Sequence, residues 1–281
     1  MDFGTVSYTA KDRVATIALN RPDRFNAINM TMPDDIAAAF TQANTDNSVH
    51  VVVLTGAGQG FCSGYDMKDF AEAPGTNPVI QDMPWDPMID YRFMGHCTQQ
   101  LMSIWRCHKP VIGRIHGDAV AGGSDIALCC DIILMNEKAH IGYPPTRVCG
   151  CPTTAMWVYR LGAERAKRML FTGDLVSGTE AERMNLIYKA VPLEDLDEEV
   201  SLLVDRIKGV PKNQLMMMKM LVNQAYENMG LANTQMIATL FDGITRHTPE
   251  GVCFKQRAEE VGFKQAVGER DSGDPIPGSK D

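Results

Sequence analysis

Residues 109–130 constrain the fold of this chain more than any other segment. Residues 109–115 alternate in polarity and are rich in β-branched side chains, which predicts a strand. The sequence HGDAVAGGSD follows at 116–125, and the apolar run at 126–130 predicts a buried turn of helix. A strand that passes through glycine-rich backbone into a helix leaves unpaired N–H groups directed at one point, where negative charge is stabilised. With Asp125 at the opening of that helix, the pattern indicates an oxyanion hole beside a carboxylate.

Two further motifs precede this segment. Residues 50–55 predict a buried strand, 56–60 a glycine-rich loop, and the sequence FCSGYDMK follows at 61–68. Upstream, LNRPDRFNA occupies 19–27. In their order and spacing the three motifs resemble the enoyl-CoA hydratase/isomerase family, also called the crotonase superfamily, and the resemblance covers roughly residues 10–265.

The remaining patterns predict an α/β chain whose C-terminal part is helical. Strands are expected at 6–8, 14–19, 132–135 and 189–192, and helices at 33–43, 88–106, 154–160, 163–172 and 177–184. After residue 196 the strand patterns end, and four helices are expected at 197–208, 213–229, 234–246 and 249–259. The resemblance implies a crotonase-type spiral of ββα units at 1–196, a helical trimerisation subdomain at 197–270 and a flexible tail at 271–281. A homotrimer or a dimer of trimers is therefore expected.

Composition narrows the choice of partners and location. The 281 residues carry a net charge of −8, which argues against a nucleic-acid partner. The sequence has no apolar run of about 18 residues and no signal-peptide pattern at its start, so a cytosolic protein without membrane contact is expected. The eight cysteines match neither the usual zinc spacings nor a disulfide framework, and no metal is expected.

The resemblance also assigns roles to particular residues. Members of the family bind an acyl thioester of coenzyme A and polarise its carbonyl with two backbone N–H groups, which by motif position belong to Ser63 and Gly122. Coenzyme A enters as part of the substrate, and no permanently bound cofactor is implied. The positions that match the family's coenzyme A contacts are Arg24, Phe25, Ala27, Asp66, Met67, Lys68, Phe263 and Lys264.

The chain departs from the family at its acids. Hydratases of the family use two glutamates, because one carboxyl group activates water while the other supplies a proton to carbon. Here Asp125 stands at the first position and Pro145 at the second, and residues 139–163 contain no Asp or Glu. The proline side chain neither donates nor accepts a proton, so the second carboxyl group that ordinary hydration in this family needs beside Asp125 is missing.

Several residues remain candidates for the proton transfer that the second glutamate performs in the family. Asp125 alone can move a proton between carbons, which is isomerase chemistry, and Tyr143 and His116 are polar neighbours by sequence. Arg147 is a candidate ligand for a substrate carboxylate. The long loop at 71–87 and the turn after it offer Asp82, Asp86 and Asp90.

The sequence thus predicts an acyl-CoA enzyme, nominally an enoyl-CoA hydratase or isomerase, with Asp125 as the proton-transfer residue and Tyr143 as a further candidate. Two alternatives stay open. One is a hydrolase or retro-Claisen lyase that uses the same oxyanion hole. The other is a family member that binds acyl-CoA without turning it over.

Overall fold

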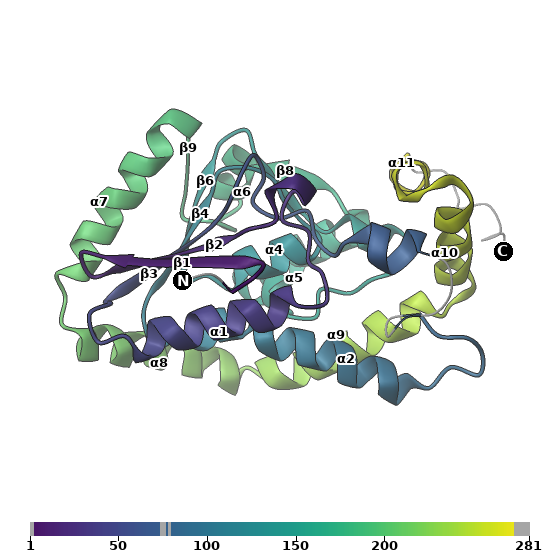
Figure 1. Cartoon of the computed structure of the whole chain (residues 1–281), viewed down its shortest axis with the longest axis horizontal. Helices are drawn as coiled ribbons and strands as arrows, with labels where there is room; N and C mark the ends of the chain where they lie inside the picture. The colour runs from purple at the N-terminus through teal and green to yellow at the C-terminus, as the bar shows by residue number, and fades with distance from the viewer. Residues whose placement is uncertain (1–2, 74–76, 78–79, 273–281) are drawn as a thin grey trace.

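The computed structural model describes residues 3–73, 77 and 80–272 and contains two sheets (Figure 1). In the larger sheet the strand order is β1-β2-β3-β4-β6-β9, with β1 antiparallel to β2 and all later neighbours parallel. The smaller sheet has the order β5-β7-β8. The strands are β1 (Val6–Lys11), β2 (Val14–Leu19), β3 (Val51–Gly56), β4 (Val111–Ile115), β5 (Ala119–Val120), β6 (Ile132–Asn136), β7 (His140–Gly142), β8 (Leu175–Ser177) and β9 (Lys189–Val191).

Strand β3 shows why an unbroken apolar run is needed at the centre of the larger sheet. Successive side chains of a strand point to opposite faces. Accordingly Val52 and Leu54 join the main hydrophobic cluster on one face, and Val51 and Val53 join a second cluster on the other. A parallel strand buried on both faces therefore reads as continuous Val and Leu rather than as an alternating pattern.

Helices cover both faces of this sheet. The helices are α1 (Met32–Thr45), α2 (Pro87–Leu101), α3 (Ser103–Arg106), α4 (Gly122–Leu128), α5 (Met156–Thr172), α6 (Gly178–Arg183), α7 (Leu196–Lys208), α8 (Lys212–Asn228), α9 (Leu231–Arg246), α10 (Pro249–Val261) and α11 (Phe263–Asp271). On one face α1 packs through Ile36 and Phe40 into the main cluster. On the other face α7 packs through Val200 and Val204.

The predicted α/β class and the four C-terminal helices are confirmed, but several details differ. Residues 88–106 form two helices, α2 and α3, separated at Met102, and α11 follows α10 as a fifth helix beyond the four that were expected. Helix α7 packs on the sheet, so the change at residue 196 marks the end of the strands and not the end of the sheet's packing. The predicted tail begins inside α11 at Asp271, and residues 273–281 of it lie outside the described part.

The smaller sheet was not predicted, because its strands are only two or three residues long. It matters for the site, since β5 leads directly into α4 and β7 pairs with β5 in parallel register. At the far end of the molecule from α7, helices α10 and α11 lie beside the short π-helix Lys68–Glu72 and the 3-10 helix Pro144–Arg147 (Figure 1).

Candidate active site

A cavity of about 890 Å³ lies between the strand ends, the glycine-rich turn and the C-terminal helices. Its wall comes from residues as far apart in the sequence as Asp23 and Asp271. All of the predicted site residues lie on this wall, namely Arg24, Phe25, Ala27, Ser63, Asp66, Met67, Lys68, Gly122, Asp125, Tyr143, Phe263 and Lys264. The structure therefore brings these residues together around one cavity.

The glycine-rich turn is built around close backbone approach. A Cβ atom on Gly123 would lie 2.1 Å from the carbonyl oxygen of Cys62, so only glycine lets this turn pack against the 61–68 motif. The residue before the helix, Ala121, has φ 53 and ψ −125. This backbone brings the chain from β5 into α4, and Gly122 becomes the first residue of the helix with no carbonyl of its own helix to bind.

Asp125 lies in the first turn of α4 and is only 3% exposed. The Thr154 hydroxyl donates a hydrogen bond of 2.6 Å to its Oδ1 atom. Burial raises the pKa of Asp125 to about 8, the Thr154 hydrogen bond acts in the opposite direction, and the nearby charge of Asp242 raises the pKa further. At neutral pH this side chain is therefore mainly a protonated carboxylic acid.

The backbone N–H groups of the two predicted oxyanion donors, Gly122 and Ser63, have different surroundings in this structure. The Gly122 N–H opens α4 on the cavity wall. The Ser63 N–H, by contrast, donates to the carbonyl oxygen of Phe25 at 3.0 Å. Phe25 itself has a left-handed backbone with φ 49, in a loop that ends the 3-10 helix Pro22–Arg24. A thioester oxygen must replace the Phe25 carbonyl before both predicted donors can bind it.

Tyr143 and Pro145, which belong to one segment after β7, also line the cavity. The Tyr143 hydroxyl donates to the carbonyl oxygen of Cys151 at 2.9 Å, and burial raises its pKa well above the usual value. Tyr143 is therefore a neutral phenol whose proton is held by the backbone. Pro145 lines the cavity in the 3-10 helix Pro144–Arg147 and presents no titratable group.

Other polar candidates from the sequence lie elsewhere. Arg147 forms ion pairs with Asp174 at 3.6 Å and with Asp271 at 3.3 Å and does not line the cavity, so nothing supports its binding of a substrate carboxylate. The His116 Nε2 atom contacts the carbonyl oxygen of Gly58 at 3.0 Å, away from the cavity wall. Likewise, neither Asp82 nor Asp86 belongs to the wall.

An ion-paired cluster on the cavity wall was missed in the sequence. Asp242 and Arg246 of α9 both line the cavity, and Arg246 forms ion pairs with Asp242 and with Asp90 of α2. The spacing of Asp242 and Arg246 is i and i+4, which is also the spacing of ordinary surface pairs on a helix. Only the packing of α9 against α2 distinguishes this pair, so the sequence alone gave no signal.

Both basic and acidic side chains line the cavity. Besides Arg24, Lys68 and Lys264, its wall includes Lys255 of α10 and Arg270 of α11, together with the acidic Asp23, Glu72 and Asp271. Lys255 and Arg270 are already paired, with Glu259 at 2.5 Å and with Asp271 at 2.8 Å. Arg24, Lys68 and Lys264 are therefore the basic side chains of this wall that can meet an anionic ligand.

Asp66 and Phe263, also predicted for coenzyme A, have structural partners as well. The Asp66 carboxylate pairs with Arg21 at 3.0 Å, which ties the 61–68 motif to the 19–27 motif. The backbone N–H of Phe263 donates to the Glu72 carboxylate at 3.1 Å, which ties α11 to the π-helix. Both contacts hold the segments that form the mouth of the cavity.

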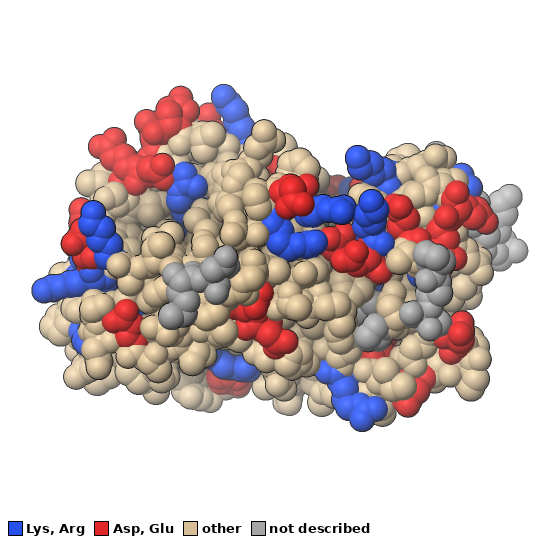
Figure 2. All heavy atoms as spheres, viewed as in Figure 1, with Lys and Arg blue, Asp and Glu red and all other residues tan. Residues whose placement is uncertain are grey.

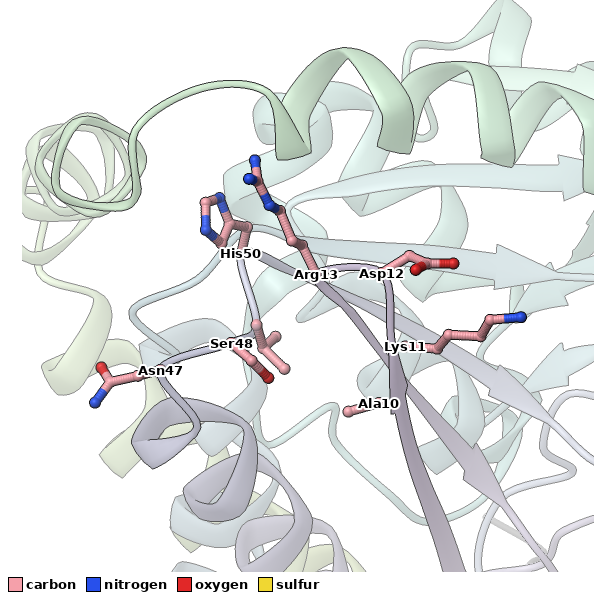
Figure 3. Close-up of a pocket in the computed structure, with 8 residues that line it drawn as sticks. Ala10, Lys11, Asp12, Arg13, Asn47, Ser48 and His50 are labelled. Carbon is pink, nitrogen blue, oxygen red and sulfur yellow. The ribbon is translucent and has the colours of Figure 1, made fainter.

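A second hollow, of about 460 Å³, lies at the turn between β1 and β2 and contains none of the predicted site residues. In Figure 3 the Lys11 and Asp12 side chains point away from Asn47 across this hollow. It is open, and no buried carboxylate or glycine-rich turn belongs to it. The larger cavity is therefore the candidate site.

The face of the molecule shown in Figure 2 carries charges of both signs. On the face shown in Figure 2, Lys and Arg are interspersed with Asp and Glu, apart from acidic atoms near α7, whose first turn carries Asp197, Glu198 and Glu199. Among the residues that the structure describes, no cluster of three or more His, Cys, Asp or Glu side chains is arranged to hold a metal ion. No helix within the described ranges is long and apolar enough to span a membrane.

Comparison with known proteins finds similar sequences over most of the chain. A family model described as enoyl-CoA hydratase/isomerase matches residues 9–259. A probable mitochondrial enoyl-CoA hydratase of Dictyostelium discoideum is 28% identical over 228 residues, which cover 80% of this chain and 77% of that protein. A probable enoyl-CoA hydratase of Mycobacterium bovis is 32% identical over 208 residues, which cover 71% and 70%.

Solved structures of enoyl-CoA hydratases have a fold similar to that of this chain. The crystal structure of an enoyl-CoA hydratase from Mycobacterium smegmatis has a TM-score of 0.90 and 43% identity, covering 100% of this chain and 99% of that one. An enoyl-CoA hydratase/isomerase from Xanthobacter autotrophicus has a TM-score of 0.86 and 27% identity, covering 98% and 100%. Because the family model matches residues 9–259, this chain belongs to the enoyl-CoA hydratase/isomerase family, and the predicted crotonase-type fold is confirmed.

Proposed function

We propose that the protein processes an acyl-CoA thioester by transferring a proton at the α-carbon, with Asp125 as the proton-transfer residue. The observation that carries this proposal is a buried carboxyl group whose pKa is raised to about 8, placed three residues after a helix-opening N–H on the wall of a cavity of about 890 Å³. A group whose pKa lies near the working pH both gives and takes a proton readily.

The reaction follows from the geometry of the turn. A thioester oxygen bound at the Gly122 N–H would lie at the start of α4, and the α-carbon next to it would lie within reach of Asp125. The helix terminus favours the negative charge that develops on this oxygen when an enolate forms. In other enzymes, loss of one such donor raises the barrier by about 3 kcal/mol. Asp125 then exchanges a proton with the α-carbon.

The second donor, Ser63, requires a local change. The Phe25 carbonyl accepts the Ser63 N–H, so in this proposal the substrate displaces that carbonyl. We assign Ser63 through its backbone and not as a nucleophile.

The coenzyme A portion belongs at the mouth of the cavity. Its phosphates carry several negative charges, and the cations at this end include the predicted Arg24, Lys68 and Lys264. The exposed Phe25 beside Arg24 offers an apolar surface for the adenine ring. The acyl chain would then point inward past Met94 and Phe70, which line the deeper wall.

We also propose that copies of the chain associate through α8 and α9 into a trimer or a dimer of trimers. These helices expose a series of large apolar side chains to solvent, which is unusual for a surface that stays free. They are Met217, Met218, Met220, Leu221 and Val222 on α8, and Met236, Ile237, Phe241 and Ile244 on α9. The cytosolic location expected from the sequence remains a prediction.

A panel of acyl-CoA thioesters tests the proposed function. The protein is incubated with crotonyl-CoA, 3-enoyl-CoA and 3-ketoacyl-CoA, and products are identified by mass and by retention. A product heavier by one water molecule, or a product of unchanged mass with a shifted double bond, supports hydratase/isomerase chemistry. Release of free coenzyme A or carbon–carbon cleavage would support a hydrolase or lyase instead. Tight binding of every thioester without a product would indicate a non-catalytic member.

A further inference from the structure

We propose that Asp242 of helix α9 is the second proton-transfer residue of this site, the base that activates water in place of the acid absent at Pro145. This inference rests on the proposed function, because it adds a water-activating group to a site in which Asp125 serves the α-carbon. It commits the protein to hydration of a 2-enoyl-CoA.

Asp242 lies beside the position that lacks an acid. A Cβ atom built on Gly150 would be 2.9 Å from the Cβ of Pro145 and 3.8 Å from Oδ1 of Asp242. The carboxylate and the proline are therefore close neighbours across Gly150, and both line the cavity. A carboxylate delivered from α9 reaches the region that a longer acidic side chain at residue 145 would otherwise occupy.

One short segment fixes both acids. The Cys151 N–H donates to Oδ1 of Asp242 at 2.9 Å, and three residues later the Thr154 hydroxyl donates to Oδ1 of Asp125 at 2.6 Å. The Thr154 carbonyl in turn accepts from Nε2 of Gln235 on α9 at 2.9 Å. The segment 151–154 thus places Asp125 and Asp242 in a defined relation, and the charge of Asp242 is felt at Asp125.

Arg246 is the positioning residue of this arrangement. Its guanidinium contacts Asp242 on one side and Asp90 on the other, and its side chain is 12% exposed. Gly243 permits this packing, because a Cβ there would lie 2.1 Å from Oδ2 of Asp90. An arginine held by two carboxylates cannot swing freely, so Asp242 is presented to the cavity in one orientation.

The two acids have different surroundings. Asp125 is buried, and its raised pKa keeps it protonated at neutral pH, whereas Asp242 contacts the guanidinium of Arg246. Two carboxyl groups in such different environments are the arrangement from which acid and base roles follow. Asp242 therefore takes the role of base and Asp125 that of acid.

The proposed step balances as follows. Asp242 takes a proton from water while the water oxygen forms a bond to the β-carbon. The π electrons of the double bond move towards the α-carbon and the thioester oxygen, which the Gly122 N–H stabilises. Asp125 delivers its proton to the α-carbon, giving a 3-hydroxyacyl-CoA. Transfer of one proton from Asp242 back to Asp125 through solvent restores the starting state.

The test compares three variants with the full-length protein, using crotonyl-CoA as the probe. Asp242→Asn keeps an oxygen for the Cys151 N–H and removes the base. Asp242→Glu restores a carboxylate. The matched control is Asp174→Asn, which removes a carboxylate that also pairs with an arginine but lies outside the cavity. Hydration is followed by the loss of the ultraviolet absorbance of the conjugated enoyl thioester, and thermal melting confirms that each variant is folded.

We expect kcat of Asp242→Asn to fall about 100-fold or more with KM within about threefold, and Asp242→Glu to recover at least about tenfold of that loss. Asp174→Asn should retain activity within about twofold. A folded Asp242→Asn variant that hydrates crotonyl-CoA within about fivefold of the parent would overturn the inference.

Failure of this inference is distinguishable from failure of the proposed function. Deuterium exchange at the α-carbon of butyryl-CoA in D₂O reports on Asp125 without any addition of water. A parent protein that exchanges this proton but does not hydrate crotonyl-CoA would keep the proposed function and refute the role of Asp242. A parent protein that does neither would refute both.

Discussion

Replacing Asp125 by asparagine should make the protein more stable while removing the proposed proton-transfer group. In the folded chain the pKa of Asp125 rises from the ordinary 3.8 to about 8, chiefly because burial disfavours the charged form. The folded state therefore holds a proton that the unfolded state has released at neutral pH. Each pH unit between the two values costs about 1.4 kcal/mol of unfolding free energy. At pH 7 the total is on the order of 4 kcal/mol.

The sign of this effect is set by proton binding. Below pH 3.8 both states are protonated and the full stability is present. As the pH rises towards about 8 the unfolded state alone loses its proton, so stability falls. Asparagine does not titrate, and its oxygen still accepts the Thr154 hydroxyl, so the Asp125→Asn variant escapes this loss.

The assay is urea denaturation of both proteins between pH 5 and 9 at one fixed protein concentration, which keeps any association constant. The stability advantage of the variant should grow by about 1.4 kcal/mol per pH unit up to pH 8 and then level off. A variant less stable than the parent at pH 7, or a difference that does not change with pH, would show that Asp125 is not the buried neutral acid described above.

Three further predictions concern turnover, ligand and assembly. In steady-state kinetics Asp125→Asn should lower acyl-CoA turnover by about 100-fold while binding stays within a few-fold, because the group that moves the proton is lost and the shape is kept; undiminished turnover would place the chemistry elsewhere. Calorimetry should find that crotonyl-CoA binds and crotonate does not, since only the thioester reaches Arg24, Lys68 and Lys264; equal affinities would argue against the cation-lined mouth as the nucleotide site. Sedimentation should give a trimer or hexamer, and Leu221→Glu on exposed α8 should dissociate it by burying a charge at the contact; a monomeric parent at micromolar concentration would contradict this.

Local patterns carried most of the fold prediction. The strands at 14–19 and 132–135 and the helix at 33–43 appear within one or two residues of their predicted bounds, because each has a clear polarity period or apolar run. The break at Met102 and the short strands β5, β7 and β8 were missed. Their presence depends on what they pack against, and no period forms over two or three residues.

Some of the site residues could likewise be predicted from local motifs, and others could not. Asp125, Ser63 and Gly122 belong to contiguous motifs, so their approach to one cavity could be predicted from the sequence. Asp242 and Arg246 belong to a helix with an ordinary charge pattern, and their position depends on how α9 docks against α2. Their burial is a tertiary property, which a single sequence does not encode in any local signal.

The hydrogen bond from the Ser63 N–H to the Phe25 carbonyl affects how strongly the proposed site binds the substrate compared with the transition state. A ground-state thioester oxygen that takes the place of Phe25 exchanges one neutral carbonyl acceptor for another, so the exchange contributes little to substrate affinity. An enolate oxygen carries negative charge and forms a stronger bond to the same N–H than the peptide carbonyl does. In the proposed function, replacing this contact therefore adds little to ground-state binding but stabilises the transition state, so it raises kcat without tightening the binding of the substrate.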